Sequence, residues 1–475
     1  MRKFRIYLLV LLLAGTGTLR VASDEIRLSE IMYHPVERPA FDGNGVPVLD
    51  LSDDVHEFVE LYNAGTSTVN LLGWHLAGGI DYDFPAGATL APGGFLVVAK
   101  DPAKLAAVAQ YGLTTNDIFG PYSGRLGNSG DTLRLQNNLG QVVDDVSYSS
   151  SFPWALGANA LGASDDWTGL NSDDYQYRGR SLERVSYAWA ATDPANWLAS
   201  PLATGPTPGR ANSVQLTRPK PVVIALSVAQ AADGARLLRS NQPIRLDVTF
   251  SDTNQLSNVA VEYFIDDIQL TGEPHFTVAL TNAGPPAGAH FAGVLPGQAN
   301  RSVVRYRILA DRGAGVEAVS PRADDPFAWW ACFVTPVRSS ANPIYDVFVS
   351  SASLNTLATN ISQSPRRVTL PDPPGLLRES WDATEPAIFV ADGQVYDIRL
   401  RYHGSHYNRT PGSKSFKYLF PRYAPFNGRF SYFEYINIDG AVERALELAN
   451  RLNPTVREPK ELQERAERRL GATGK

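Results

Sequence analysis

Short runs of alternating apolar and polar residues, separated by turns, constrain the fold of this chain most. EIRLSEIMYH and EFVELYN near the start, then DTLRLQN and QVVDDVSY, repeat with a period of two residues, as half-buried strands do. Turn signals such as NAGTST, APGG and LGNSGD lie between them. This pattern predicts a mostly β protein of sandwiches or barrels. The 39 Gly and 33 Pro residues favour the same class over a helical one.

The chain is too long for a single hydrophobic core, because about 150 residues per domain gives roughly three domains. We predict a first β region over residues 24–213. A second, residues 214–335, has the strand pattern of an immunoglobulin-like or fibronectin type III sandwich of about 100 residues. The stretch TGPTPGRANSVQLTRPKP predicts a linker between them. In SVVRYRILADRG the arginines alternate with apolar residues, which predicts an exposed strand face.

The N-terminus has the pattern of a secretory signal peptide. Basic residues at positions 2, 3 and 5 precede the apolar run IYLLVLLLAG, and the small residues Val21 and Ser23 follow it. This predicts cleavage after residues 1–23. The alternative is an uncleaved anchor helix, although the run is shorter than the roughly 20 residues that span a bilayer. We therefore expect an exported protein, periplasmic, cell-surface or secreted, with no transmembrane segment after cleavage.

The charge of the mature chain argues against a nucleic-acid partner. Cleavage would remove four basic residues and leave 39 Lys and Arg against 49 Asp and Glu, a formal charge of -10. A globally acidic protein does not bind nucleic acid by general electrostatic attraction. Any basic patch would therefore act locally.

The first β region resembles a known family. SEIMYHP, the long segment from EFVELYNAGTST to FLVVAKDP, DPANWLAS and TPGRAN are similar to bacterial lamin tail domains over nearly the whole of residues 26–213. That family has an immunoglobulin-like β-sandwich. The resemblance implies a binding or spacer module and carries over no catalytic residues.

Residues 336–440 resemble the start of the spore-coat CotH kinase family. The order of the segments carries the resemblance: EPAIFV, a Gly-containing hairpin turn ADGQ, VYDIRLRYHGS and then KSFKYLF. The similarity implies part of an α+β kinase-like N-lobe. Residues 441–475 are charged and have a helical pattern, which predicts a helical C-terminal tail.

A basic stretch lies within this region. Residues 399–429 contain seven Lys and Arg and no acid, with aromatic residues between them. The patch could face phosphates of a nucleotide, form a plain basic solvent face of a sheet, or bind a nucleic-acid strand. If the kinase resemblance holds, the phosphate-binding candidates are Arg399, Arg401, Lys414 and Lys417. Because side chains alternate along a strand, Arg399 and Arg401 share one face and Leu400 lies on the other.

Phosphoryl transfer also needs carboxylates that hold Mg²⁺ or Mn²⁺. Only 61 residues follow Lys414, and their acids lie mostly in the charged helical pattern. We therefore predict no catalytic residues. If this region is a kinase, we expect ATP with Mg²⁺ or Mn²⁺ as its cofactor. Otherwise we expect no cofactor.

We also predict no metal site. Asp81 and Asp83 could chelate a cation, but alternate acids on a strand more often form its solvent face. His34, His56 and His75 lack metal-ligand spacing. A single cysteine excludes an intramolecular disulfide, and Cys332 reads as a small core residue.

The sequence as a whole favours an exported, multidomain binding or surface-association protein. Its partner would be a protein or a surface polysaccharide, and its CotH kinase-like region would be incomplete and inactive. The first alternative is an atypical ATP-dependent kinase of the CotH family that modifies exported proteins. The second is an adhesive or carbohydrate-binding surface protein, because stacked sandwiches also suit that role.

Overall fold

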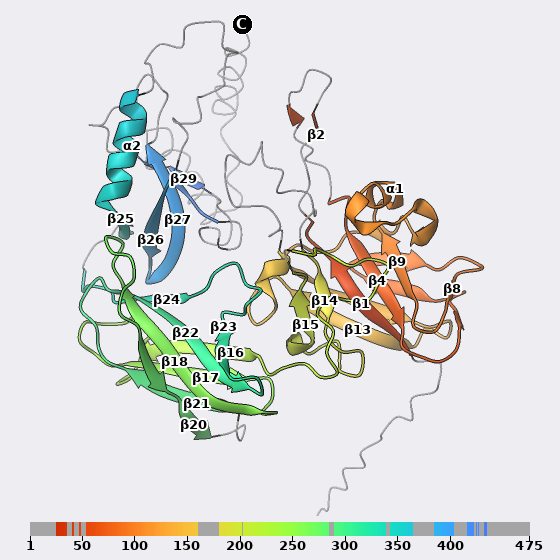
Figure 1. Ribbon diagram of the computed structural model, residues 1–475, viewed down its shortest axis with the longest axis horizontal. Helices are drawn as coiled ribbons and strands as arrows, with labels where there is room; N and C mark the ends of the chain where they lie inside the picture. The colour runs from red at the N-terminus through yellow and green to blue at the C-terminus, as the bar shows by residue number, and fades with distance from the viewer. Residues whose placement is uncertain are drawn as a thin grey trace, which may run out of the picture. The chain divides into compact units, whose positions relative to one another are not determined.

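The computed structural model describes residues 25–35, 40–41, 47–48, 54–159, 180–201, 203–284, 289–338, 343–363, 384–402, 416–421, 424, 426 and 432–434 (Figure 1). They form two compact units. The first unit comprises the described residues within 25–35, 54–154 and 180–219. The second unit comprises all the other described residues. The chain is mostly β, with several sheets, which confirms the predicted fold class. No helix in the described part of the chain is long and apolar enough to cross a membrane.

The first unit contains a six-stranded sheet and a five-stranded sheet. The larger has the order β10 (Ile118–Phe119), β9 (Phe95–Ala99), β4 (Phe58–Asn63), β1 (Ile26–Met32), β14 (Leu182–Arg184), β15 (Trp197–Ala199). The smaller has the order β11 (Ser123–Gly124), β7 (Ile80–Asp83), β6 (His75–Gly78), β12 (Gly130–Gln136), β13 (Val142–Ser149). A short pair joins β5 (Val69–Asn70) to β8 (Thr89–Leu90). Except for the parallel pair β9–β10, neighbouring strands of the two larger sheets are antiparallel.

The six-stranded sheet is covered on both faces. Every residue of β1 is buried, so its alternating sequence does not produce a wet face. Met32 and Phe58 pack in a cluster with Leu105 of the short helix α1 (Pro102–Ala106), which lies beside β9 (Figure 1). Trp74 is also buried, at 4% exposure.

The segment DPAKLAAVAQYG forms a short helix with marked ends. Asp101 caps α1 by accepting hydrogen bonds from the amides of Ala103 and Lys104 at 3.0 and 3.1 Å. The α-helix ends after five residues, and a 3-10 turn at Ala109–Tyr111 follows it. Gly112 then closes the segment with φ 67°, where glycine avoids the strain of a side chain.

The second unit begins with two sheets. One has the order β16 (Val223–Gln230), β17 (Ile244–Phe250), β21 (His290–Leu295), β20 (Thr281–Gly284). The other has β19 (Phe276–Ala279), β18 (Leu256–Asp266), β22 (Val303–Arg312), β23 (Val316–Ser320), and β24 (Trp330–Phe333) also pairs with β22. Buried side chains such as Leu246 and Ile308 line both sheets. This arrangement is consistent with the predicted immunoglobulin-like class.

A further five-stranded antiparallel sheet belongs to the same unit. Its strands follow the chain: β25 (Tyr345–Val349), β26 (Glu385–Ala391), β27 (Gln394–Tyr402), β28 (Phe416–Leu419), β29 (Tyr432–Glu434). The predicted ADGQ hairpin is present, because Asp392 and Gly393 turn the chain with φ 49° and 79°. The predicted kinase-like lobe remains a prediction, and the helical tail 441–475 lies outside the described residues.

One helix that the sequence predictions did not include is α2 (Ser351–Gln363), which lies beside β25 and β26 (Figure 1). Its apolar residues at 354, 357, 358 and 361 have the spacing of an amphipathic helix. Leu357 is buried against Phe389 and Leu400 of the sheet, whereas Leu354 is 36% exposed. Packing on the sheet therefore stabilises this helix.

Candidate functional site

The predicted basic face exists on β27 and β28. Arg399 and Arg401 alternate with Ile398 and Leu400, which are buried in the core under α2. Backbone register places Arg401 opposite Lys417. Three of the four predicted phosphate-binding residues therefore lie on one face of the sheet. The fourth, Lys414, lies outside the described residues.

The arginines of this face already have protein partners. Arg399 donates to the hydroxyl of Thr384 at 2.6 Å and to the carbonyl oxygen of the same residue at 2.5 Å. Arg401 donates to the carbonyl oxygen of Tyr402 at 3.3 Å. The face can attract an anion, but Arg399 would have to exchange these bonds for bonds to a phosphate.

The carboxylates on the same face are engaged too. Asp346 accepts hydrogen bonds from Arg338 at 2.8 Å and pairs with Arg301 at 3.4 Å. Asp397 accepts two bonds from Arg305, at 2.8 and 2.5 Å. Within the described part of this sheet, neither aspartate is free to hold a Mg²⁺ or Mn²⁺ ion beside the basic residues.

Arg305 corrects the expectation that the arginines of SVVRYRILADRG lie on an exposed face. It is 7% exposed, because β25–β28 pack on this face of β22 through Val303, Ile388 and Val395. Its guanidinium donates to Asp266 at 2.7 Å as well as to Asp397. Flanking carboxylates of this kind stabilise a buried cation and raise the pKa of Arg305.

Three buried glutamates form a row across the six-stranded sheet of the first unit. Register pairs Glu30 of β1 with Glu183 of β14 on one side and with Glu60 of β4 on the other. All three have 0% exposure. The segment 205–214, whose Gly205, Pro206, Thr207, Pro208 and Asn212 are buried, supplies their hydrogen-bond donors. The first half of the predicted linker is thus a packed part of this unit.

The hydrogen bonds show how the row avoids carrying three negative charges. The hydroxyl of Thr207 lies 3.2 Å from Glu30 Oε2 and 3.1 Å from Glu183 Oε1. A hydroxyl has one hydrogen, so it can donate to only one of these oxygens, and the other carboxyl must donate to it. Glu183 Oε2 accepts from the amide of Ser213 at 2.7 Å and from its hydroxyl at 2.6 Å, which suits an ionised group. Glu30 Oε1 likewise accepts two bonds, from the hydroxyl of Ser181 at 2.5 Å and from the amide of Thr207 at 2.9 Å. We assign the proton to Glu30 because burial raises its pKa to about 8.

Burial supports the same assignment. Burial, then the neighbouring Glu183, raises the pKa of Glu30 to about 8. Burial and the adjacent Glu30 raise the pKa of Glu60 well above its usual value. Glu60 Oε2 accepts from the amide of Gly209 at 2.5 Å, but its Oε1 has no hydrogen-bond partner among the described residues. An unpartnered buried oxygen is less costly on a neutral carboxyl than on a carboxylate.

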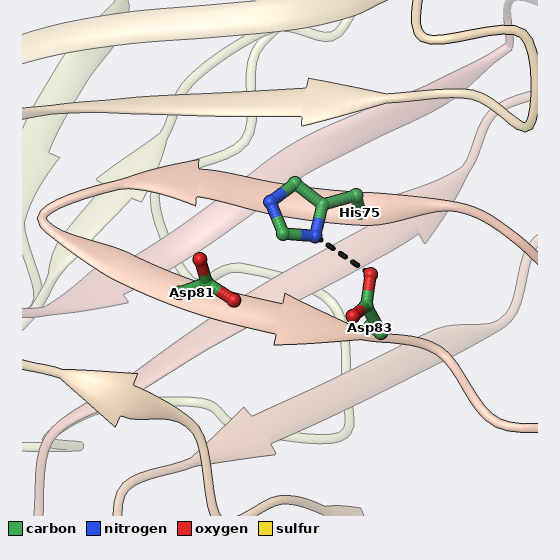
Figure 2. Close-up of side chains that lie close together, drawn as sticks. All are labelled: His75, Asp81 and Asp83. Atoms are coloured by element: carbon green, nitrogen blue, oxygen red, sulfur yellow. Dashed lines mark hydrogen bonds and ion pairs between the residues drawn. The ribbon is translucent and has the colours of Figure 1, made fainter.

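A second cluster lies on the exposed face of the β6–β7 hairpin. Figure 2 shows His75 on one strand facing Asp81 and Asp83 on the other. His75 Nδ1 and Asp83 Oδ1 are 2.9 Å apart, and one ligand atom from each of the three residues lies within 4.8 Å of the others. Exposure of Asp81 and Asp83 agrees with the expected solvent face. Cross-strand register brings His75 to Asp83.

Comparison with known proteins identifies one segment of the chain. The model of the lamin tail domain family matches residues 21–150. No curated protein gives a match. The matched segment includes β1, β4 and the hairpin with His75, Asp81 and Asp83, and this part of the chain is similar to lamin tail domains. The structure adds β14, β15 and the segment 205–214 to the same compact unit.

Proposed function

We propose that this chain is an exported, multidomain binding protein that associates with a protein or a surface polysaccharide through its β-sandwiches. One observation carries the proposal: residues 21–150 match the lamin tail domain, an immunoglobulin-like fold. Such a sandwich is a rigid scaffold that presents loops to a partner and needs no catalytic group. The signal-peptide pattern of residues 1–23 supports the export that this role requires.

The chemistry of the described carboxylates supports binding over catalysis. Glu30, Glu60 and Glu183 are buried acceptors for a segment of their own unit. Asp346 and Asp397 are occupied by arginines. The three glutamates therefore act in the fold itself, and the two aspartates are held in ion pairs.

We include an incomplete, inactive CotH kinase-like region in the proposal. The order β26, tight turn, β27, β28 with basic residues on one face agrees with the resemblance described above. The alternative, an active ATP-dependent kinase, needs acids that hold a divalent metal beside those basic residues. Two acids of this sheet, Asp346 and Asp397, are already paired with arginines.

The second alternative, carbohydrate binding, is favoured by an aromatic cluster on β18 and on the segments just before β19 and β24. The rings of Phe264 and His275 stack at 4.9 Å, and Trp329 meets both edge-on. Arg307 lies 4.2 Å from the Trp329 ring centroid and donates to Glu262 at 2.6 Å. His275 is 41% exposed. Half-exposed rings beside polar groups suit the apolar faces and hydroxyls of a sugar.

A sedimentation assay tests the proposal. The full chain is mixed with isolated bacterial cell envelopes, untreated, protease-treated or stripped of polysaccharide by glycosidases, and the bound fraction is measured against concentration. We expect saturable binding that one of the two treatments removes. Trp329→Ala should weaken binding only if the chain binds the polysaccharide of the envelope. Phe276→Ala is the matched control, because Phe276 pairs with Tyr263, the residue before Phe264 on β18, and therefore lies on the opposite face. Absence of saturable binding to every envelope preparation contradicts the proposal.

A further inference from the structure

The β6–β7 hairpin holds three potential metal ligands in fixed relative positions. Register pairs His75 with Asp83 and Leu76 with Tyr82. Because side chains alternate, Asp81 lies on the same face as Asp83, and Leu76 is buried on the other face. The hairpin is also paired with β12 on one side and β11 on the other. All three side chains therefore project from a supported part of the sheet.

We propose that His75, Asp81 and Asp83 bind a divalent first-row transition metal ion such as Zn²⁺. The donor set decides the class of ion, because an imidazole nitrogen with carboxylate oxygens suits Zn²⁺ and its neighbours. Ca²⁺ and Mg²⁺ prefer sets made of oxygen alone. Three protein ligands leave further coordination positions for water or for a group on a partner.

The distances fit such an ion after a small movement. Two ligands about 2.1 Å from a tetrahedral Zn²⁺ are roughly 3.4 Å apart. The three ligand atoms lie within 4.8 Å of one another, and His75 Nδ1 is 2.9 Å from Asp83 Oδ1. The side chain of Asp83 is 85% exposed, so it can rotate without disturbing the core. The ion would take the place of the hydrogen between the imidazole and Asp83.

Charge at the cluster also favours a cation. Two carboxylates face one imidazole, and no Lys or Arg in the described part of the chain forms an ion pair with Asp81 or Asp83. Arg134, on the same face of the sheet, is opposite Ala77 on β6 and Asp145 on β13. A divalent ion would neutralise both aspartates at once.

A metal titration of the full chain tests the proposal. Zn²⁺ binding is measured by competition with a chromophoric chelator, and Co²⁺ absorption reports whether a nitrogen ligand is bound. We expect one equivalent of Zn²⁺, with affinity about tenfold or more lower in His75→Ala, Asp81→Asn and Asp83→Asn. Circular dichroism of each variant shows that the fold is kept, as expected for exposed positions.

The matched control is His275→Ala. His275 Nδ1 contacts Glu262 Oε1 at 2.8 Å, so the pair resembles His75 and Asp83 but has no second aspartate beside it. Zn²⁺ affinity should be unchanged in this variant. Three results would each overturn the proposal: no Zn²⁺ binding by the folded chain, equal affinity in the wild type and in His75→Ala, or Ca²⁺ binding as tightly as Zn²⁺.

Discussion

Glu30 and Glu183 face each other on neighbouring strands at 0% exposure, with the single hydroxyl of Thr207 between one oxygen of each. The hydroxyl can be a donor to one carboxyl only if the other is a donor to it. One proton is thus shared through Thr207 in a place where two bare carboxylates would repel each other. The arrangement joins β1, β14 and the segment 205–214 in one network.

Replacing single glutamates of the row by glutamine should show how much each carboxyl contributes to the stability of the first unit. We expect Glu183→Gln to destabilise the first unit by about 1–3 kcal/mol, because an amide cannot accept every bond that Ser213 and Thr207 make to the carboxylate. Glu60→Gln is the matched control and should cost less, since one oxygen of Glu60 has no donor to lose. The melting temperatures of both variants give the comparison. A greater loss in Glu60→Gln would show that the proton assignment is wrong.

The same row predicts how stability depends on pH. Because the pKa of Glu30 is raised to about 8, the folded chain keeps a proton that the unfolded chain releases above about pH 4.5. The folded state therefore binds more protons, and its stability should fall as pH rises from about 4.5 to 8. Urea midpoints measured across this range should decrease. In Glu30→Gln the decrease should be smaller, and an unchanged slope would exclude Glu30 as its cause.

Arg305 should contribute far more to stability than an exposed arginine. Arg305→Ala would leave Asp266 and Asp397 beside the apolar contact of Val303 without their cation. The loss should be about 2–3 kcal/mol, because Asp266 would remain a mostly buried charge without its cation, whereas Asp397 is 48% exposed and can be solvated. Arg245→Ala, which breaks an exposed pair with Asp247, should cost about 1 kcal/mol or less. Urea unfolding of the two variants is the measurement, and equal losses would contradict the burial of Arg305.

The basic face should bind nucleotide weakly and should not support catalysis. Cations attract phosphates, but they do not replace the metal that neutralises charge on a transferred phosphoryl group. We expect weak, salt-sensitive ATP binding at most, lost in Lys414→Ala or Lys417→Ala. With γ-labelled ATP, Mg²⁺ or Mn²⁺ and acceptor proteins, residues 24–475 should transfer no label. Transfer that disappears in a lysine variant would support the kinase alternative.

Export makes a separate prediction about the N-terminus. If residues 1–23 are a signal peptide, protein recovered from the envelope or the medium should begin near Asp24. Mass spectrometry of the N-terminal peptide measures this directly. An intact Met1 on protein confined to the cytoplasm would contradict both the signal peptide and the surface role.

Local patterns were sufficient to predict several parts of this protein. The period of two indicated the β class and placed Arg399 and Arg401 opposite Leu400, because neighbouring side chains on a strand point to opposite faces whatever surrounds them. The turn at Asp392 and Gly393 was readable for a similar reason, since a positive φ is set by the turn itself. The lamin tail segment was readable from its own residues.

Only the tertiary structure decided which polar faces meet water. Glu30, Glu60 and Arg305 occupy alternating positions that look like solvent faces, yet a folded-back segment covers the glutamates and another sheet covers the arginine. His75 meets Asp83 through the register of the β6–β7 hairpin, which the short turn between the strands sets and which metal-ligand spacing rules do not include. Alternation along a strand and the register of a hairpin are local properties, whereas the cover over a strand comes from packing between distant segments.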